Sequence, residues 1–349
     1  MMKGSERKCG RMRKILIWLL CAGLLAGCTG SGNRQTVFQA TYLDVFDTVT
    51  VISGRADSRA EFTAAAEEIH GNLMELHRLF DIYQDYEGLS NLKTVNDNAG
   101  IKPVAVDERI LTLLSDCKAY DALTGHRVNA AMGSVLALWH DAREAARTDP
   151  AQAALPDDAA LKEAARHRDW AQVILDEEAG TVFLADPEMR LDVGAVAKGW
   201  ATEAAAQSAP EGFLLSVGGN VRATGAKDGK GTGWVVGVAN PDGGDYLRKV
   251  AVTSESVVTS GDYQRYFTVD GVRYCHIIDP DTLYPGTRWR AVTVVCRDSG
   301  LADALSTGLF LLSREEGEAL LTRCGGEALW VAPDGEIYTT PGFDAYIVN

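Results

Sequence analysis

The stretch that most restricts the fold of this chain is a run of small residues over 190–200, RLDVGAVAKGW. It follows an apolar run, residues 181–184, that is typical of a strand, and it leads into residues 201–207, which favour a helix. Such a junction can direct free backbone N–H groups and the positive end of a helix dipole at an anion. Asp192 and Lys198 place opposite charges on either side of it. A tight turn, in which the glycines only relieve crowding, explains the stretch equally well. Residues elsewhere in the chain must decide between an anion-binding junction and a plain turn.

The first residues have the composition of an export signal. Basic residues between 7 and 14 precede an apolar segment, residues 15–25, that is too short to span a bilayer. Small residues before Cys28 resemble a bacterial lipobox; an ordinary secretory signal or a short anchor is the alternative. Acyl chains on Cys28 would hold the protein on the extracytoplasmic face of the cell membrane. The predicted organisation is a signal peptide (1–27), a lipidated cysteine with a flexible tether rich in Ser and Gly (28–40), and one large domain (41–349).

The charge of the chain excludes several kinds of partner. Its formal net charge is −14, and because residues 1–27 carry six Lys or Arg and one Glu, the remainder stands at −19. This charge argues against nucleic acid and against an electrostatic hold on anionic lipid. An anionic substrate would therefore need a local cation. Cys117, Cys275, Cys296 and Cys324 show no zinc spacing, and both disulfides and free buried thiols remain open for them.

The expected elements are those of an α+β protein with mixed, largely antiparallel sheets flanked by helices. Apolar residues at helical spacing predict a helix over 59–80, and a β-branched run predicts a strand over 45–52. Residues 83–100 are typical of a long irregular segment. An Ala- and charge-rich stretch with two prolines predicts an exposed helical insertion around 141–168. The C-terminal half alternates like strands, without the regular βαβ order of a doubly wound sheet.

Four segments carry residues that chemistry could use: 190–200, 216–220 (SVGGN), 259–280 with its His276, and 302–307. Two glycines in the second segment let the backbone approach a ligand closely. Asp303 and Thr307 lie one helical turn apart and so share a face, and their carboxylate and hydroxyl are hard oxygen donors that suit magnesium. Alone, each signal has a plain structural explanation: a solvated or capping Asp-Thr pair, a packed histidine and a simple turn.

Together these segments resemble one family. DVGAVAKG, SVGGN, TSGDYQRYF, HIIDP and ADALST occur in the order and approximate spacing of the FAD:protein FMN transferases, the ApbE-type flavin transferases. The resemblance covers the chain from about Val45 to its C-terminus, and the leader also fits. It implies an α+β fold and a metal-dependent transfer from FAD. A Thr or Ser hydroxyl of a partner protein attacks the FMN-side phosphorus, AMP leaves, and FMN stays on the partner as a phosphodiester.

The same resemblance implies which residues form the site. Mg²⁺ would be bound by the Ala195 carbonyl and by the side chains of Asp303 and Thr307. Lys198 and Asp303 would serve catalysis, and His276 would accept or orient the proton of the acceptor hydroxyl. FAD would contact Phe46, Asn91, Leu92, Lys93, Asn129, Lys198, Ser216, Gly218, Gly219, His276, Ile277 and Ile278.

The sequence departs from the family pattern at four positions. Asn129 and Ala131 stand where many members have Asp and Thr, Cys275 stands where a second His often precedes His276, and Phe46 stands where some members have Met. We expect altered flavin contacts at these positions. The residues predicted to hold the metal, and the lysine beside them, are all retained.

Two other functions use parts of the same pattern. Water could replace the hydroxyl, which would make the protein an FAD pyrophosphatase that yields FMN and AMP. A non-catalytic surface flavin-binding lipoprotein would need the glycine turn but not Lys198 with Asp303 and Thr307, so the three together favour an enzyme. The chain has no obvious acceptor segment, so any acceptor is another protein. The family suggests a membrane-associated electron-transfer protein on the same side of the membrane.

Overall fold

The computed structural model describes residues 36–348, and its base is one antiparallel sheet of eight strands. Each strand in the order β1-β2-β6-β7-β10-β13-β14-β15 pairs antiparallel with its neighbours. This confirms the expected α+β fold with largely antiparallel sheets. The strands are β1 (Thr36–Val45), β2 (Thr48–Ala56), β6 (Phe213–Val217), β7 (Asn220–Ala223), β10 (Ser256–Gly261), β13 (Ala291–Cys296), β14 (Glu327–Val331) and β15 (Ile337–Thr339).

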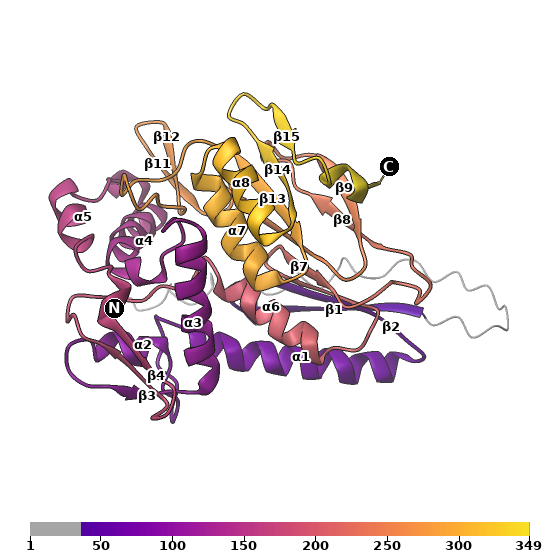
Figure 1. The fold of residues 1–349 in the computed structure, drawn as a ribbon, viewed down its shortest axis with the longest axis horizontal. Coiled ribbons are helices and arrows are strands. Elements are labelled where there is room, and N and C mark those ends of the chain that lie inside the picture. The colour runs from indigo at the N-terminus through magenta and orange to yellow at the C-terminus, as the bar shows by residue number, and fades with distance from the viewer. Residues whose placement is uncertain (1–35, 349) are drawn as a thin grey trace, which may run out of the picture. The chain divides into compact units, whose positions relative to one another are not determined.

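Helices cover one face of this sheet and a smaller sheet covers the other (Figure 1). Along β13, Val292 and Val294 pack with the helices, whereas Ala291 and Val295 pack with the smaller sheet, because side chains alternate along a strand. All six residues of β13 are therefore buried. The covering elements are α1 (Arg59–Phe80), α6 (Ala197–Ser208), α7 (Ser299–Leu311) and α8 (Arg314–Cys324) on one face, and β8 (Trp234–Val238), β9 (Arg248–Val252), β16 (Ile347–Val348) and η4 (Phe343–Tyr346) on the other.

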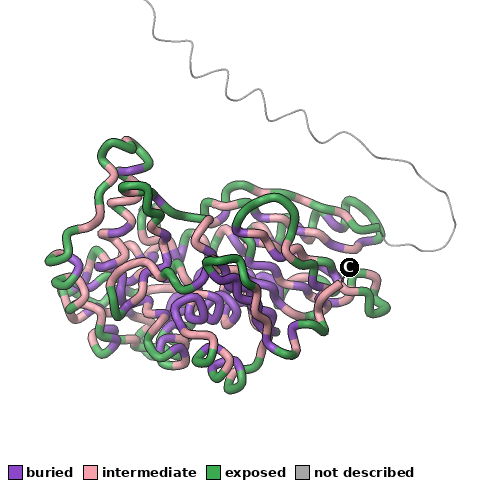
Figure 2. The backbone as a smooth tube through the Cα atoms, turned by 90° about the horizontal axis from the view of Figure 1, so that it is seen from above, coloured by how far each residue is buried: buried purple, intermediate pink, exposed green. Residues whose placement is uncertain are grey.

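The remaining helices and short strands form a lobe beside one end of the sheet, as Figure 1 shows. Its apolar residues between 92 and 131 and between 170 and 184 join those of α1 and β2 in one continuous core, so the lobe is not a separate domain. Its apolar residues between 132 and 165 form a smaller cluster with the segment 267–284. In Figure 2 the buried positions gather in the middle and the loops at the margins are exposed. The elements of this lobe are α2 (Leu92–Asp97), β3 (Val104–Ala105), α3 (Glu108–Leu123), η1 (Ala130–Met132), α4 (Gly133–Thr148), η2 (Pro150–Gln152), α5 (Asp158–Ala164), η3 (Trp170–Gln172), β4 (Val173–Asp176) and β5 (Thr181–Leu184), and the hairpin β11 (Tyr266–Val269) and β12 (Val272–Cys275) packs on α4.

Three local expectations differ from the structure. Residues 45–52 are not one strand, because Phe46 and Asp47 adopt positive φ angles of 50° and 52° and turn the chain from β1 into β2. The segment 83–100 contains α2, which the Asn91 side chain caps. Residues 141–148 continue α4, which ends just before Pro150.

The ends of the described chain bear on the predicted domain boundaries. β1 begins at Thr36, so residues 36–40 belong to the sheet, although the sequence placed them in the tether. The predicted signal peptide and Cys28 lie outside the described residues. Within the described part, no helix is long and apolar enough to cross a membrane. The four cysteines of that part carry free thiols, and three of them are buried.

Gly199 sets how closely α6 and α7 pack. A Cβ atom at this position would lie 2.3 Å from the Ser299 carbonyl oxygen and 2.4 Å from the Asp303 Cβ. We therefore expect Gly199→Ala to force the helices apart and to lower the free energy of unfolding by about 1–3 kcal/mol. Urea denaturation measures this change.

Gly71 provides the matched control, because it lies inside α1 and is exposed, and a Cβ atom added to it would have no neighbour within 4 Å. Gly71→Ala should raise the free energy of unfolding by about 0.5–1 kcal/mol, since alanine is the better helix former. Equal effects of the two substitutions would contradict the packing explanation.

Candidate functional site

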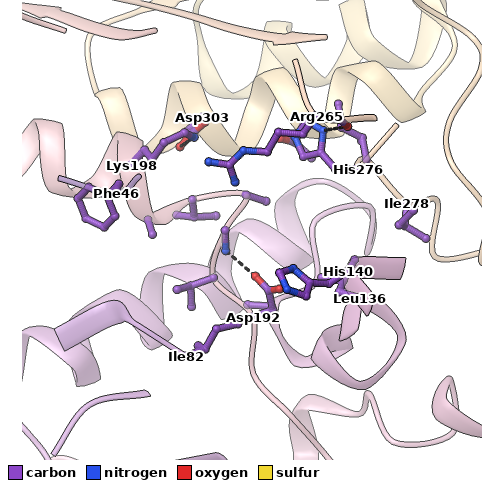
Figure 3. A pocket seen from close by; sticks show the side chains of 18 of the residues that line it. Phe46, Ile82, Leu136, His140, Asp192, Lys198, Arg265, His276, Ile278 and Asp303 are labelled. Carbon is purple, nitrogen blue, oxygen red and sulfur yellow. Dashed lines mark hydrogen bonds and ion pairs between the residues drawn. The ribbon is translucent and has the colours of Figure 1, made fainter. Parts of the chain in front are cut away.

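A cavity of about 1060 Å³ lies where the sheet, α6, α7 and the side lobe meet. It is at the upper end of the size range of small-molecule sites, which suits a ligand as large as a dinucleotide. Residues from all four chemically suggestive segments line it, and Figure 3 shows several of them projecting toward one another. The wall includes Phe46, Ala195, Lys198, Gly218, Ser260, His276, Asp303 and Thr307.

The junction between residues 190 and 200 forms one wall of this cavity. α6 begins there, and the Gly199 N–H donates a hydrogen bond of 2.8 Å to Asp303 Oδ2 on α7. Lys198 Nζ lies 3.6 Å from the same carboxylate oxygen, and Figure 3 shows the two side chains together. Asp303 is only 3% exposed. A buried carboxylate needs partners, and these two contacts provide them at the cavity wall.

Three residues with oxygen donors suited to a hard cation line this cavity: Asp303 with its carboxylate, Thr307 with its hydroxyl and Ala195 with its backbone carbonyl. The Gly199 N–H could have bonded the Ala195 carbonyl four residues earlier, but it bonds Asp303 instead. No hydrogen bond to that carbonyl is present within residues 36–348. The Thr307 hydroxyl is oriented by Ser260 Oγ, 3.3 Å away.

This donor set fits Mg²⁺ better than a metal whose ligands all come from the protein. Within the described part of the chain there is no cluster of three or more His, Cys, Asp or Glu side chains able to hold a metal. Magnesium is commonly held by one or two carboxylates, with substrate phosphates and water completing its shell. One carboxylate, one hydroxyl and one free carbonyl beside an open cavity meet that requirement.

His276 enters the cavity as a neutral imidazole. Its Nδ1 lies 3.2 Å from the Arg265 carbonyl oxygen, and its backbone N–H donates to the same oxygen at 3.0 Å. Because a carbonyl only accepts, we assign the proton to Nδ1, which leaves the Nε2 lone pair free. Burial, followed by the nearby charges of Arg265, Lys198 and Arg143, lowers the pKa of His276 to about 3. The uncharged Nε2 is therefore open to a hydrogen bond from a bound hydroxyl at neutral pH.

The structure separates the predicted flavin-binding residues into two groups. Phe46, Asn129, Gly218, Ile277 and Ile278 line the cavity, as do Lys198 and His276. Asn129 also has a structural role, because its side chain accepts from the Ala131 N–H at 2.8 Å and donates to the Arg168 carbonyl at 3.2 Å.

The other five predicted flavin-binding residues are not on the described cavity wall: Asn91, Leu92, Lys93, Ser216 and Gly219. Asn91 caps α2 and is fully buried, as is Leu92. Lys93 pairs with Asp97 at 2.5 Å and with Asp85 at 3.3 Å. Ser216 lies within β6, opposite Val51, and Gly219 lies in the turn that follows.

Several cavity residues were not singled out from the sequence. Leu136, His140, Arg143 and Arg147 project from one face of α4. Asp192, which the sequence already marked beside Lys198, lies next to His140 in Figure 3. Burial raises the pKa of Asp192, whose side chain accepts from the Gly194 N–H at 2.8 Å. The spacing of the α4 residues, which places them on one helical face, was an available signal. It was missed because the Ala-rich stretch from residue 141 suggested an exposed insertion.

Comparisons with known proteins identify the family of the chain and its fold. The sequence profile of the ApbE family matches residues 36–330. The chain is 34% identical to the FAD:protein FMN transferase of Treponema pallidum, covering 94% of this chain and 92% of that protein. It is 33% identical to one from Klebsiella pneumoniae, covering 74% and 83%. The crystal structure of the ApbE protein of Thermotoga maritima superposes with a TM-score of 0.80 at 29% identity, over 90% of this chain and all of that one. The flavin transferase ApbE of Vibrio cholerae, at 24% identity over 89% of this chain and all of that one, shares the fold with a TM-score of 0.73.

Proposed function

The chain belongs to the ApbE family, and on that premise we propose that it is an FAD:protein FMN transferase that moves the FMN half of FAD onto a hydroxyl of another protein. The observation that carries the proposal is the meeting of Lys198 and Asp303 on the wall of a dinucleotide-sized cavity that Ala195 and Thr307 also line. A binding protein for flavin would need the cavity but not this arrangement.

We propose that Mg²⁺ serves the reaction and that Asp303, Thr307 and the Ala195 carbonyl hold it. When bound, it would supply positive charge to the diphosphate of FAD, whose oxygens gain charge as the bond breaks. Lys198 adds a fixed cation at the same wall. This local positive charge offsets the acidic character of the chain as a whole.

The protein residues would position the two reactants and move one proton. The oxygen of the acceptor hydroxyl forms a bond to the FMN-side phosphorus. The bond from that phosphorus to the bridging oxygen breaks, and its electron pair leaves with AMP. His276 Nε2 takes the hydroxyl proton, which its neutral state and its hydrogen bond to the Arg265 carbonyl allow.

Purified protein with FAD and Mg²⁺ tests this function directly. With a candidate membrane electron-transfer protein that offers a Thr or Ser hydroxyl, AMP release measured by chromatography should rise well above the rate without it. Comparable AMP release without any acceptor would instead identify an FAD pyrophosphatase. Tight FAD binding with no AMP in either case would leave the non-catalytic flavin-binding protein.

We also propose that Cys28 is lipidated and anchors the protein on the extracytoplasmic face of the membrane. The basic, apolar and small-residue pattern before Cys28 supports this, and the acceptor would then be a protein exposed on the same side. In bacterial cells fed a labelled fatty acid, the wild-type protein should carry the label and sediment with membranes. Cys28→Ala should lose both properties. Label on the Cys28→Ala protein would contradict the proposal, and Cys9→Ala provides the control.

A further inference from the structure

We infer that Arg265 is a further catalytic residue, whose guanidinium binds the FMN-side phosphate of FAD and neutralises it while it is transferred. The inference rests on the proposed function. Arg265 lies in the short connection between β10 and β11 and lines the cavity. Figure 3 shows its side chain extending from the His276 side of the cavity toward Lys198 and Asp303.

The Arg265 guanidinium has no counterion in the described part of the protein. Within residues 36–348, the Arg265 guanidinium has neither an ion pair nor a hydrogen bond. The other arginines of the cavity are partnered: Arg127 with Asp279 at 3.2 Å, Arg147 with Glu144 at 2.7 Å, and Arg143 with Glu144 at 3.7 Å. In a chain as acidic as this one, an unpaired arginine that points into a cavity is available to an anionic ligand.

The Arg265 guanidinium also lies where the transferred phosphate would pass. In an in-line displacement, the proton acceptor lies near the attacking oxygen, and the charge that stabilises the leaving group lies on the opposite side of the phosphorus. His276 and the Lys198–Asp303 pair occupy two such places, and the Arg265 guanidinium lies between them in Figure 3. A group in that place faces the non-bridging oxygens of the transferred phosphate, and the planar guanidinium can bind two of them at once.

The backbone of Arg265 is held by hydrogen bonds to its carbonyl oxygen, whereas its guanidinium makes none within residues 36–348. Its carbonyl oxygen accepts from both the backbone N–H and the Nδ1 of His276. A substitution of the side chain leaves these two hydrogen bonds in place. The effect of the charge can therefore be measured without removing the contact that orients His276.

The test compares Arg265→Gln with wild type in transfer and in binding. Without the guanidinium, we expect kcat for FMN transfer to fall by about 10²–10³-fold, the usual effect of losing one donor to a developing charge. Fluorescence titration should show weaker binding of FAD and of FMN, by about tenfold, the size of a lost charged hydrogen bond. Binding of riboflavin, which has no phosphate, should not change. Arg265→Lys should recover only part of kcat, because an ammonium cannot bind two oxygens in a fork.

Arg273→Gln is the matched control, because Arg273 lies on β12, in the hairpin that follows Arg265, but stacks over the Tyr266 ring at 4.3 Å and is not on the cavity wall. It should behave as wild type. Transfer at the wild-type rate by Arg265→Gln would overturn the inference and leave the proposed function standing. Equal loss of riboflavin and FMN binding would also overturn it, since the side chain would then act through the ring or the fold. If wild type transfers no FMN but Arg265→Gln selectively loses FMN binding, the phosphate contact stands and the proposed reaction fails.

Discussion

Asp303→Asn is expected to lower the rate of FMN transfer by at least about 10²–10³-fold while the protein stays folded. The amide oxygen of asparagine can still accept the Gly199 N–H, which now donates to Asp303 at 2.8 Å, so the contact between α6 and α7 is kept. What is lost is the negative charge, which the proposed Mg²⁺ and Lys198 both need. The measurement is single-turnover transfer at several Mg²⁺ concentrations, with the thermal midpoint as a check on folding.

The matched control for this substitution is Glu315→Gln, which neutralises an exposed carboxylate in the first turn of the neighbouring helix α8. It should transfer FMN at the wild-type rate. We also expect that high Mg²⁺ restores part of the activity of Asp303→Asn, because a weakened site fills at higher concentration. A folded Asp303→Asn protein with wild-type transfer at low Mg²⁺ would remove this carboxylate from the chemistry.

His276→Gln should have the second largest effect, a fall of about 10²–10⁴-fold in transfer. Glutamine can still donate to the Arg265 carbonyl, which now lies 3.2 Å from His276 Nδ1, but it cannot take up a proton. FAD affinity should stay within a few fold of wild type, because the imidazole is neutral in the free protein and contributes little charge to binding. A quench-flow assay of transfer, together with a fluorescence titration of FAD, separates the two quantities.

His70→Gln is the control for the histidine, since His70 lies on α1, pairs with Asp44 at 2.9 Å and is not on the cavity wall. It should leave transfer unchanged. If His276→Gln instead weakens FAD binding as much as it slows transfer, the histidine is a binding residue and another group accepts the proton.

The features that the sequence predicted well are those set by local spacing. The helix expected over 59–80 has those bounds in the structure, because its apolar residues recur at helical spacing and Ser58 caps it. Asp303 and Thr307 share the cavity face of α7, since i and i+4 positions lie on one side of any helix. A helix also follows the small-residue stretch as expected, but it begins at Ala197 and not at residue 201, and only the structure shows that Gly199 brings α6 against Asp303.

The features that escaped prediction depend on tertiary contacts. The turn at Phe46 and Asp47 carries no glycine or asparagine, and Asp47, a polar residue within the β-branched run, was the one weak mark of a change of direction. The flavin contact of Asn91 stays a prediction, whereas its roles in capping α2 and in donating to the Gln84 carbonyl follow from the structure alone. Arg265 is exposed on a loop, and its importance follows only from what lies across the cavity.

The central claim is that the wall built from Asp303 and Lys198 splits FAD and leaves FMN on another protein. Intact mass spectrometry of a candidate acceptor, incubated with this protein, FAD and Mg²⁺, tests it most directly. The account predicts that the acceptor gains the mass of one FMN less one water on a Thr or Ser, with one AMP released for each FMN attached, and that Asp303→Asn abolishes the gain. Equal amounts of free FMN and AMP with an unmodified acceptor would contradict it.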